Sequence, residues 1–539
     1  MNGTDFQNIE KNGQNENNNG QKEDVIITDL RDYGSFECVF AWLCLLIGYL
    51  FCCAFPPTEF PLGTFIVAFI CVVTTALTLI RNKAKIGVLE WFLAFLSLAF
   101  SFAFLLNTNT CPTFVSLACA LVSYAFFVYR ASGNNAGSGN SDFLPLELWR
   151  ALKGFSILAI ADMFRLMFTR KNKSFKAILK ILIGLIAAVI PTAIVISLLS
   201  YDGRFSELLR NAFSFIIDFD FREQLLYVSF GCIIAMYIFG LYAVNTSERK
   251  PLDCEAMRER SERVRFAPLL TVIATLFPLA VVYIFFFVSQ WDYYLSAFTG
   301  KLPEGVVNYA EYARNGFFEL CTVSAINLVI IIAVALFTRR KGNVEKAFLR
   351  VVSALFSVMT LVLIGTALAK MYLYINRFGL TEKRLLSSWL MIVIALVFVF
   401  IAIRSIFKKF RLFAASTVAV ALMCGVLVIS DYSSLIANYN VERYISGETD
   451  EIDLKALINA DTSAIPAMAR LMEYCQENGK TDSYGFTRLE NELLQEKKRL
   501  DNQNDIFSFS FPGQRAKKAI EEYYAKYPVE HETADPIYD

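Results

Sequence analysis

Side chains that can do chemistry gather in the stretch NYAEYARNGFFEL, residues 308–320, at the entrance to a long apolar run. They are two tyrosines, two acids and one base: Tyr309, Glu311, Tyr312, Arg314 and Glu319. Glu319 follows two phenylalanines and falls inside the apolar run. An ionisable side chain inside a membrane-spanning segment is energetically costly and commonly functional, so the stretch is a candidate ligand-binding site.

A cation that could meet Glu319 comes from a second apolar run. Lys370 lies near the end of that run and is followed by Tyr374 and Arg377. A buried carboxylate and a buried ammonium are each expensive alone and tolerable as a pair. We therefore predict a ligand-binding site that includes all four of these residues. A structural ion pair beside a belt of aromatic residues at headgroup level is the alternative.

The elements that must position these residues are apolar helices. The chain has 539 residues, of which 55% are hydrophobic and only 19% are charged. Apolar runs of about twenty residues recur between residues 36 and 430, and each can cross roughly 30 Å of hydrocarbon. A closed β-barrel would instead show short alternating segments, which the sequence lacks. We predict an all-α, polytopic membrane protein with a small C-terminal all-α soluble domain.

Basic residues in the loops predict how the spans are oriented. The spans, about eleven in all, are placed at residues 37–54, 62–80, 87–106, 113–129, 176–199, 225–244, 267–289, 316–338, 350–373, 387–407 and 412–430. Lysine and arginine resist translocation, and the basic loops after the second, sixth, eighth and tenth spans fall on one side. The N-terminus is therefore predicted to be cytoplasmic and the C-terminus extracytoplasmic.

Composition divides the chain into five predicted segments. They are a disordered polar tail (1–35), four N-terminal spans (36–130), a cytoplasmic linker with amphipathic helices (131–175), a core of seven spans (176–430) and an extracytoplasmic helical tail domain (431–539). Residues 142–168 carry charges that would be costly in mid-bilayer, so this part is predicted to contact anionic lipid at the cytoplasmic surface. Residues 204–219 keep helical spacing and predict an outer interfacial helix.

Several function classes are excluded by composition. The net charge is +1, which gives no general attraction to nucleic acid. The single histidine, His531, argues against histidine-ligated metals and Ser–His–Asp hydrolysis. The sequence contains no P-loop motif, so ATP hydrolysis is not expected. We predict no cofactor and no metal.

Three stretches resemble a known family. FTGKLPEGVVNYAEYARNGFFEL, MYLYINRFGLTEKRLLSSW and LIANYNVERY, at residues 298–320, 371–389 and 435–444, are similar to a bacterial multi-span membrane family catalogued as a domain of unknown function, numbers 4153 and 4173. The likeness covers roughly residues 180–470, and the N-terminal third departs from the pattern. The resemblance implies a bacterial plasma-membrane protein of similar topology and supplies no activity. The predicted topology separately places the three stretches on the outer face.

The loop around Arg377 is basic although it is predicted to face outward, because Lys383 and Arg384 follow. Such a loop is expected to bind an anionic group, which could be a lipid headgroup, a cell-wall polymer or the acidic start of the tail domain. We rank the tail first, with the acids Glu448, Asp450, Glu451 and Asp453. Inside the eighth span, Asn327 is predicted to form a hydrogen bond between helices.

Three functions remain open. The first is an uncharacterised integral membrane protein in solute or lipid translocation or envelope maintenance, with an outward-facing polar and aromatic site for a small solute or lipid. The second is a membrane-embedded enzyme that acts on a lipid-linked substrate, and the third is a membrane sensor or scaffold. An enzyme would bring Glu311, Glu319 and Lys370 together in an outward cleft. A scaffold would pair its charges and pack its interior closed.

Overall fold

The computed structural model describes residues 35–134, 143–154, 156–168, 221–248, 262–289, 309–339, 342–449, 451–458, 461–481, 484–502 and 505–528, together with Glu255 and Glu259. For residues 309–316 the description covers the backbone alone. This described part is helical apart from its loops and one isolated bridge between Ala267 and Thr338.

Ten helices in the described ranges are long and apolar enough to cross a membrane. They are α1 (Ser35–Cys53), α2 (Pro61–Arg81), α3 (Val88–Phe102), α4 (Thr110–Ala131), α10 (Phe221–Ala243), α12 (Leu269–Ser289), α14 (Tyr309–Phe337), α15 (Asn343–Phe378), α16 (Glu382–Ile406) and α17 (Leu412–Ile429). Each coincides with a span predicted from the sequence, so the all-α polytopic class is confirmed. The predicted span at 176–199 and the interfacial helix at 204–219 lie outside the described residues.

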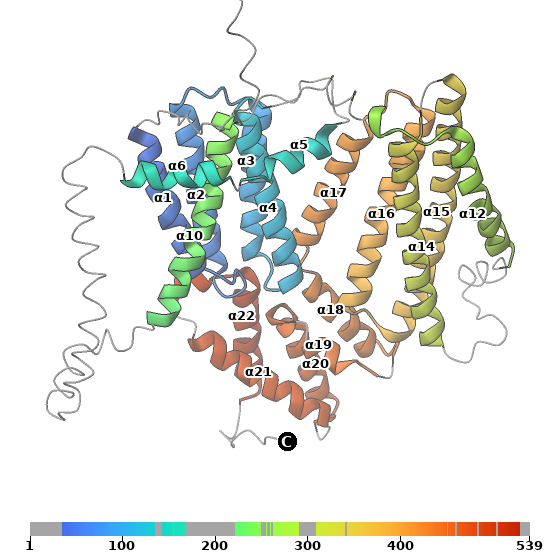
Figure 1. Ribbon diagram of the computed structural model, residues 1–539. Coiled ribbons are helices and arrows are strands. Elements are labelled where there is room, and N and C mark those ends of the chain that lie inside the picture. Colours follow the sequence, from blue (N-terminus) through green and yellow to red (C-terminus); the bar gives the residue numbers. More distant parts are fainter. Residues whose placement is uncertain are drawn as a thin grey trace, which may run out of the picture.

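The spanning helices form two groups (Figure 1). In the first, α1 to α4 and α10 surround a core that includes Phe40, Phe127 and Phe239. In the second, α12, α14, α15 and α16 surround a core that includes Phe356 and Phe398. Helix α17 lies between the groups and packs on both α4 and α16. The order of the spans in the sequence therefore differs from their order in space, since α10 packs along α1.

Two glycines explain why α1 and α10 lie so close. A Cβ atom added to Gly231 would stand only 2.9 Å from the backbone of Gly48 and Tyr49. Small residues at such a crossing let two helix backbones approach, which is a common way to pack helices in lipid. The hydroxyl of Tyr49 also donates to Gln224 Oε1 at 2.8 Å, across the same pair of helices.

Two short helices lie across the end of the bundle that carries the start of α1. They are α5 (Leu144–Ala151) and α6 (Ile157–Phe168), both too short to span a bilayer. The thiol of Cys38 on α1 donates to the Leu166 carbonyl at 3.3 Å, which ties α6 to this end. Their contact with anionic lipid stays a prediction.

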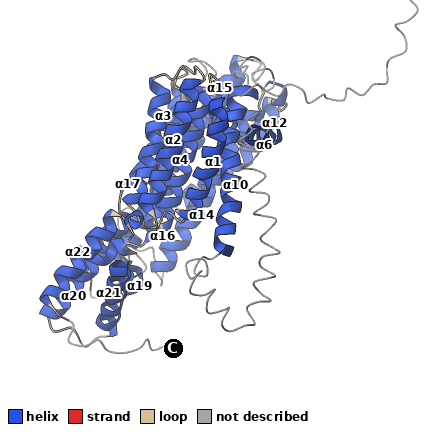
Figure 2. Ribbon diagram, turned by 90° about the vertical axis from the view of Figure 1, so that its left-hand side faces the viewer, coloured by secondary structure: helices blue, strands red, loops and turns tan. Residues whose placement is uncertain are grey.

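A helical tail domain occupies the opposite end of the bundle (Figures 1 and 2). It contains α18 (Tyr432–Ile445), α19 (Leu454–Ile458), η4 (Thr462–Ala464), α20 (Ile465–Glu477), α21 (Tyr484–Asn502), η5 (Ile506–Ser508) and α22 (Phe511–Lys526). Its core includes Met468, Met472, Leu493 and Ile520. The tail is thus a small domain with its own apolar core, as a soluble unit requires.

Candidate functional site

The structure brings the predicted outer stretches to one end of the bundle. Helix α14 begins, α15 ends and α16 begins at the end that carries the tail domain (Figure 1). Helix α18 (Tyr432–Ile445), which contains all of LIANYNVERY, packs on α16 and hydrogen-bonds to the end of α15. The described parts of the three stretches that carry the family resemblance therefore share one end of the molecule.

Helix α18 presents a different face to each neighbour. Tyr432 and Ile436 join a small core with Leu427 of α17. Ala437 and Val441, four residues apart and hence on one face, belong to the core of the tail domain. Asn440 and Arg443 form hydrogen bonds with residues 375–380, at the end of α15. Helix α18 thus connects the tail domain to the membrane bundle in two ways. It follows α17 directly in the backbone, and its side chains contact the spanning helices.

Asn440 holds the backbone at the link between α15 and α16. Its Oδ1 accepts from the Leu380 amide at 2.8 Å, and its Nδ2 donates to the Leu380 carbonyl at 2.7 Å. The preceding residue, Gly379, has φ +76°, a region that favours glycine. A Cβ on Gly379 would stand 2.6 Å from Asn440 Oδ1, so the close approach also requires glycine here.

Arg443 closes the C-terminal end of α15. Its Nη2 donates to the Asn376 carbonyl at 2.8 Å and its Nη1 to the Ile375 carbonyl at 3.4 Å. Its Nε donates to Glu448 at 3.2 Å. Carbonyls in the last turn of a helix have no partner within the helix and carry partial negative charge, so a guanidinium is well matched to them. We call these contacts of Asn440 and Arg443 with residues 375–380 the α15–α18 junction.

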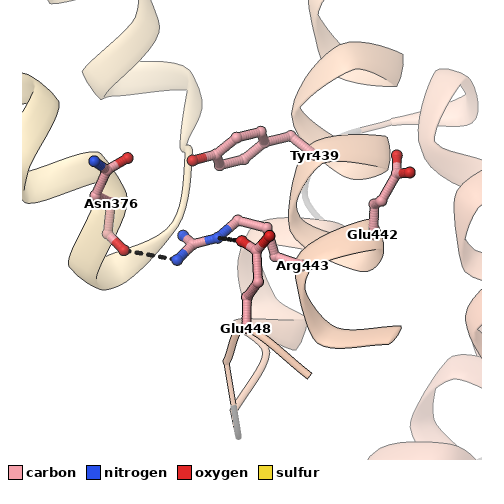
Figure 3. Close-up of a pocket in the computed structure, with 5 residues that line it drawn as sticks. All are labelled: Asn376, Tyr439, Glu442, Arg443 and Glu448. Atoms are coloured by element: carbon pink, nitrogen blue, oxygen red, sulfur yellow. Dashed lines mark hydrogen bonds and ion pairs between the residues drawn. The ribbon is translucent and has the colours of Figure 1, made fainter. Parts of the chain in front are cut away.

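An open pocket of about 490 Å³ lies at the junction. It is lined by Asn376, Tyr439, Glu442, Arg443 and Glu448. Tyr439 and Arg443 extend from α18 toward α15, while Glu442 points to another side (Figure 3). Among the described residues, the Glu442 carboxylate has no hydrogen-bond or ion-pair partner. The pocket therefore combines a fixed cation with an acid that remains available to a ligand.

The basic loop finds different partners from the predicted ones. Arg384 donates to the carbonyls of Phe378 and Gly379, and its guanidinium stacks over Tyr374 at 4.1 Å from the ring centre. The expectation that the acidic tail neutralises this loop is therefore wrong for Arg384. Glu448, the first of the predicted acids, pairs with Arg443 instead. Backbone carbonyls satisfy Arg384 because the glycine turn exposes them beside it.

Two predicted site residues sit on neighbouring helices with different surroundings. Lys370 on α15 is buried, with 3% exposure, whereas Glu319 on α14 is exposed. Glu319 interacts electrostatically with Lys370 across the two helices. Their pairing as a ligand site stays a prediction.

The other predicted residues are placed less completely. Tyr309, Glu311, Tyr312 and Arg314 lie in the first turns of α14, where the helix starts earlier than the predicted span. Their side chains lie outside the description. Tyr374 packs against Arg384, and Arg377 is exposed. These residues share the tail end of the bundle with the pocket.

A buried tyrosine adds a further link between the tail domain and the bundle. The hydroxyl of Tyr432, only 1% exposed, donates to Glu382 at the start of α16 at 2.7 Å. Burial first, and then the neighbouring Glu382 carboxylate, raise the pKa of Tyr432 well above its ordinary value. The hydroxyl therefore stays protonated and keeps donating.

The membrane interior holds one polar chain that the sequence anticipated. Asn327 accepts a hydrogen bond from Tyr283 of α12 and donates to Thr360 of α15 at 2.9 Å. The Thr360 hydroxyl in turn donates to the Phe356 carbonyl at 2.6 Å. The predicted role of Asn327 as an interhelical hydrogen-bonding residue is confirmed.

The sequence predicts no roles for the polar residues of LIANYNVERY, residues 435–444. A usable signal was present: Tyr439, Glu442 and Arg443 recur at helical spacing on one face. Asn440 adjoins that face. A polar stripe on a helix whose opposite side is apolar indicates a contact surface. Asn440 and Arg443 contact mostly backbone groups of residues 375–380. A sequence pattern does not reveal contacts with backbone groups.

Comparisons with known proteins give one match. A family described as "Domain of unknown function (DUF4153)" matches residues 43–471. No curated protein and no solved structure matches the chain. The match begins in α1, so the N-terminal spans, which seemed to depart from the pattern, are part of the family region.

Proposed function

The chain belongs to the DUF4153 family of unknown function, and we propose that it is a membrane protein that binds a zwitterionic headgroup or solute at the α15–α18 junction. This binding would serve solute or lipid translocation, or maintenance of the cell envelope. The pocket at the junction is the observation that supports this function. It joins residues of a membrane-spanning helix to residues of the tail domain, where a lipid headgroup or solute can enter from water.

The chemistry of the lining supports a ligand that carries both charges. A guanidinium has five N–H groups. Arg443 uses three of them on two carbonyls and Glu448. The remaining N–H groups can donate to a phosphate or carboxylate of the ligand. The Glu442 carboxylate lines the same pocket from another side and can accept from an amine. The Tyr439 ring lies against the Arg443 guanidinium, with the guanidinium carbon 5.5 Å from the ring centre.

Removing the acid of the pocket is expected to weaken binding of such a ligand. The probe is short-chain phosphatidylethanolamine, titrated calorimetrically into the full chain in detergent. Glu442→Gln should weaken its binding by about tenfold or more, because a charge-assisted hydrogen bond contributes roughly 1.5–3 kcal/mol. Glu521→Gln, an exposed acid on α22, is the matched control and should bind as the parent protein does.

Two comparisons sharpen this test. Phosphatidylglycerol of the same chain length lacks the amine and should bind more weakly than phosphatidylethanolamine. Free phosphoethanolamine separates a solute site from a lipid site. The proposal fails if no probe gives saturable binding, or if Glu442→Gln binds phosphatidylethanolamine as tightly as the control.

A sensor or scaffold is the second candidate, and the contacts between tail and bundle favour it. Asp431 pairs with Arg515 of α22 at 2.6 Å. Tyr432 and Arg443 contact α16 and α15, and Asn440 contacts the link between these two helices. Such contacts would transmit a change in the membrane domain to the tail domain. This candidate gains weight if no probe binds while substitutions at the junction still impair the cell envelope.

We further propose that the pocket faces outward from the cytoplasmic membrane. At the end of the bundle away from the tail domain, α2 and α16 carry Arg81 and Arg404, Arg339 follows α14, and Lys408 follows α16. Basic residues favour the cytoplasmic side. The tail domain, at the other end, would then be extracytoplasmic.

Reporter fusions test this orientation. Alkaline phosphatase fused after the C-terminus is expected to be active, because that enzyme matures only outside the cytoplasm, where disulfides form. The control fusion ends in the loop after α16, near Lys408, and should be inactive. Green fluorescent protein at the two positions should give the opposite pattern. A fluorescent C-terminal fusion with an inactive phosphatase partner would reverse the proposed orientation.

A further inference from the structure

The tail domain carries an exposed apolar loop at the level where spanning helices end. The loop is IFSFSF, residues 506–511, between α21 and α22. Ile506 is 77% exposed, Phe507 51% and Phe511 42%. Water-exposed side chains of this size in a compact run indicate a surface that is covered by something else.

Two local caps fix the shape of the loop. The Asp505 carboxylate accepts from the Phe507 amide at 2.9 Å at the start of η5. The Ser510 hydroxyl accepts from the Gly513 amide at 3.2 Å at the start of α22. These two cap hydrogen bonds hold the backbone of the loop in place while its apolar side chains stay exposed.

The loop continues the lipid-facing surface of the bundle. A Cβ on Gly63, in the first turn of α2, would lie 3.5 Å from Phe507 Cβ, so Phe507 rests against the end of that span. The ring of Phe511 packs on Phe102 at the end of α3, with ring centres 6.4 Å apart. Phe102 and Phe95, seven residues apart, lie on one face of α3, and both are exposed.

This continuity identifies the occupant. In a helix long and apolar enough to span, an exposed phenylalanine such as Phe95 faces lipid. Phe511 extends the same apolar surface past the end of α3. Aromatic side chains are favoured at the level of the lipid headgroups, where their rings are partly desolvated.

We propose that residues 506–511 insert into the lipid leaflet on the tail side and anchor the tail domain to the membrane surface. The anchor holds the start of α22, at Phe511, at the bilayer surface. It acts apart from the α15–α18 junction, which lies at the other group of spanning helices. The tail domain would therefore be held at two separate places, once through protein contacts at the junction and once through this loop in lipid.

Depth-dependent fluorescence quenching tests the anchor. Ile506→Cys is introduced into the full chain without its native cysteines, labelled with an environment-sensitive NBD dye and placed in lipid nanodiscs. We expect emission shifted to shorter wavelength and loss of intensity with lipids that carry a nitroxide near the headgroup. Ile506 is chosen because its exposed side chain can be replaced without loss of packing.

Position 521 provides the matched control. Glu521→Cys lies on α22, about 15 Å along the helix from Phe511, and should report water and resist quenching. If removing the native cysteines prevents folding, Ile506→Trp in the parent sequence is quenched by the same lipids and compared with the parent. Emission from position 506 that matches position 521, with no quenching by lipid nitroxide, would overturn the proposal.

Discussion

Gly231→Val is expected to disrupt the packing of α1 against α10 and to destabilise the protein by about 3 kcal/mol, at the upper end for overpacking. A side chain at this position would meet backbone atoms of Gly48 and Tyr49, at 2.9 Å already for its first carbon. Backbone cannot rotate aside as a flexible side chain can, so the helices must separate. The measurement is the temperature at which detergent-solubilised protein loses its monodisperse size-exclusion peak.

Gly365→Val is the control for this experiment. Gly365 also lies within a spanning helix, but a Cβ atom there would have no neighbour within 4 Å. The two variants add the same side chain to the same class of helix, so helix propensity affects both alike. We expect only the Gly231 variant to lose thermal stability. Equal midpoints for the two variants would contradict the close approach of α1 and α10.

Gly379→Ala is expected to open the α15–α18 junction. The added methyl group would stand 2.6 Å from Asn440 Oδ1, and the backbone at φ +76° would be strained. Strain of this kind costs about 1–3 kcal/mol, and each of the two Asn440 hydrogen bonds contributes about 1 kcal/mol. The expected result is faster proteolytic release of the tail domain from folded protein in detergent.

Two further variants separate strain from collision at this position. Gly447→Ala also changes a glycine at φ +76°, but a Cβ there meets nothing within 4 Å. It should therefore show a smaller effect on proteolysis. Asn440→Ala combined with Gly379→Ala should restore part of the loss that the collision causes. If Gly447→Ala releases the tail domain as fast as Gly379→Ala, the contact with Asn440 is not what holds the junction.

The spans could be predicted because their signal is local. Run length and hydropathy depend on consecutive residues, and a helix in lipid satisfies its own backbone hydrogen bonds. Ten predicted spans therefore reappear as helices in the described residues. For the same reason Asn327 could be recognised, since an amide in a long apolar run must find a partner on another helix.

Hydropathy and run length could not predict which groups the side chains at the α15–α18 junction contact. Lys370 and Glu319 were chosen as charges within apolar runs, and the structure gives them different burial. Arg443 and Asn440 lie in a polar stretch after the last span, where a polar side chain carries no signal of its own. Arg443 pairs with one nearby side chain, Glu448, but its contacts across the junction are carbonyls.

The sequence by itself determined the class of protein and the ten described helices that are long and apolar enough to cross a membrane. Those features follow from hydropathy and charge, which act residue by residue. Only the tertiary structure decided that α10 packs on α1 and that α18 holds the end of α15. Both depend on backbone meeting backbone or side chain at a distance along the chain, as at Gly231 and Leu380. Backbone groups are the same in every residue but proline, so such contacts leave little trace in a sequence.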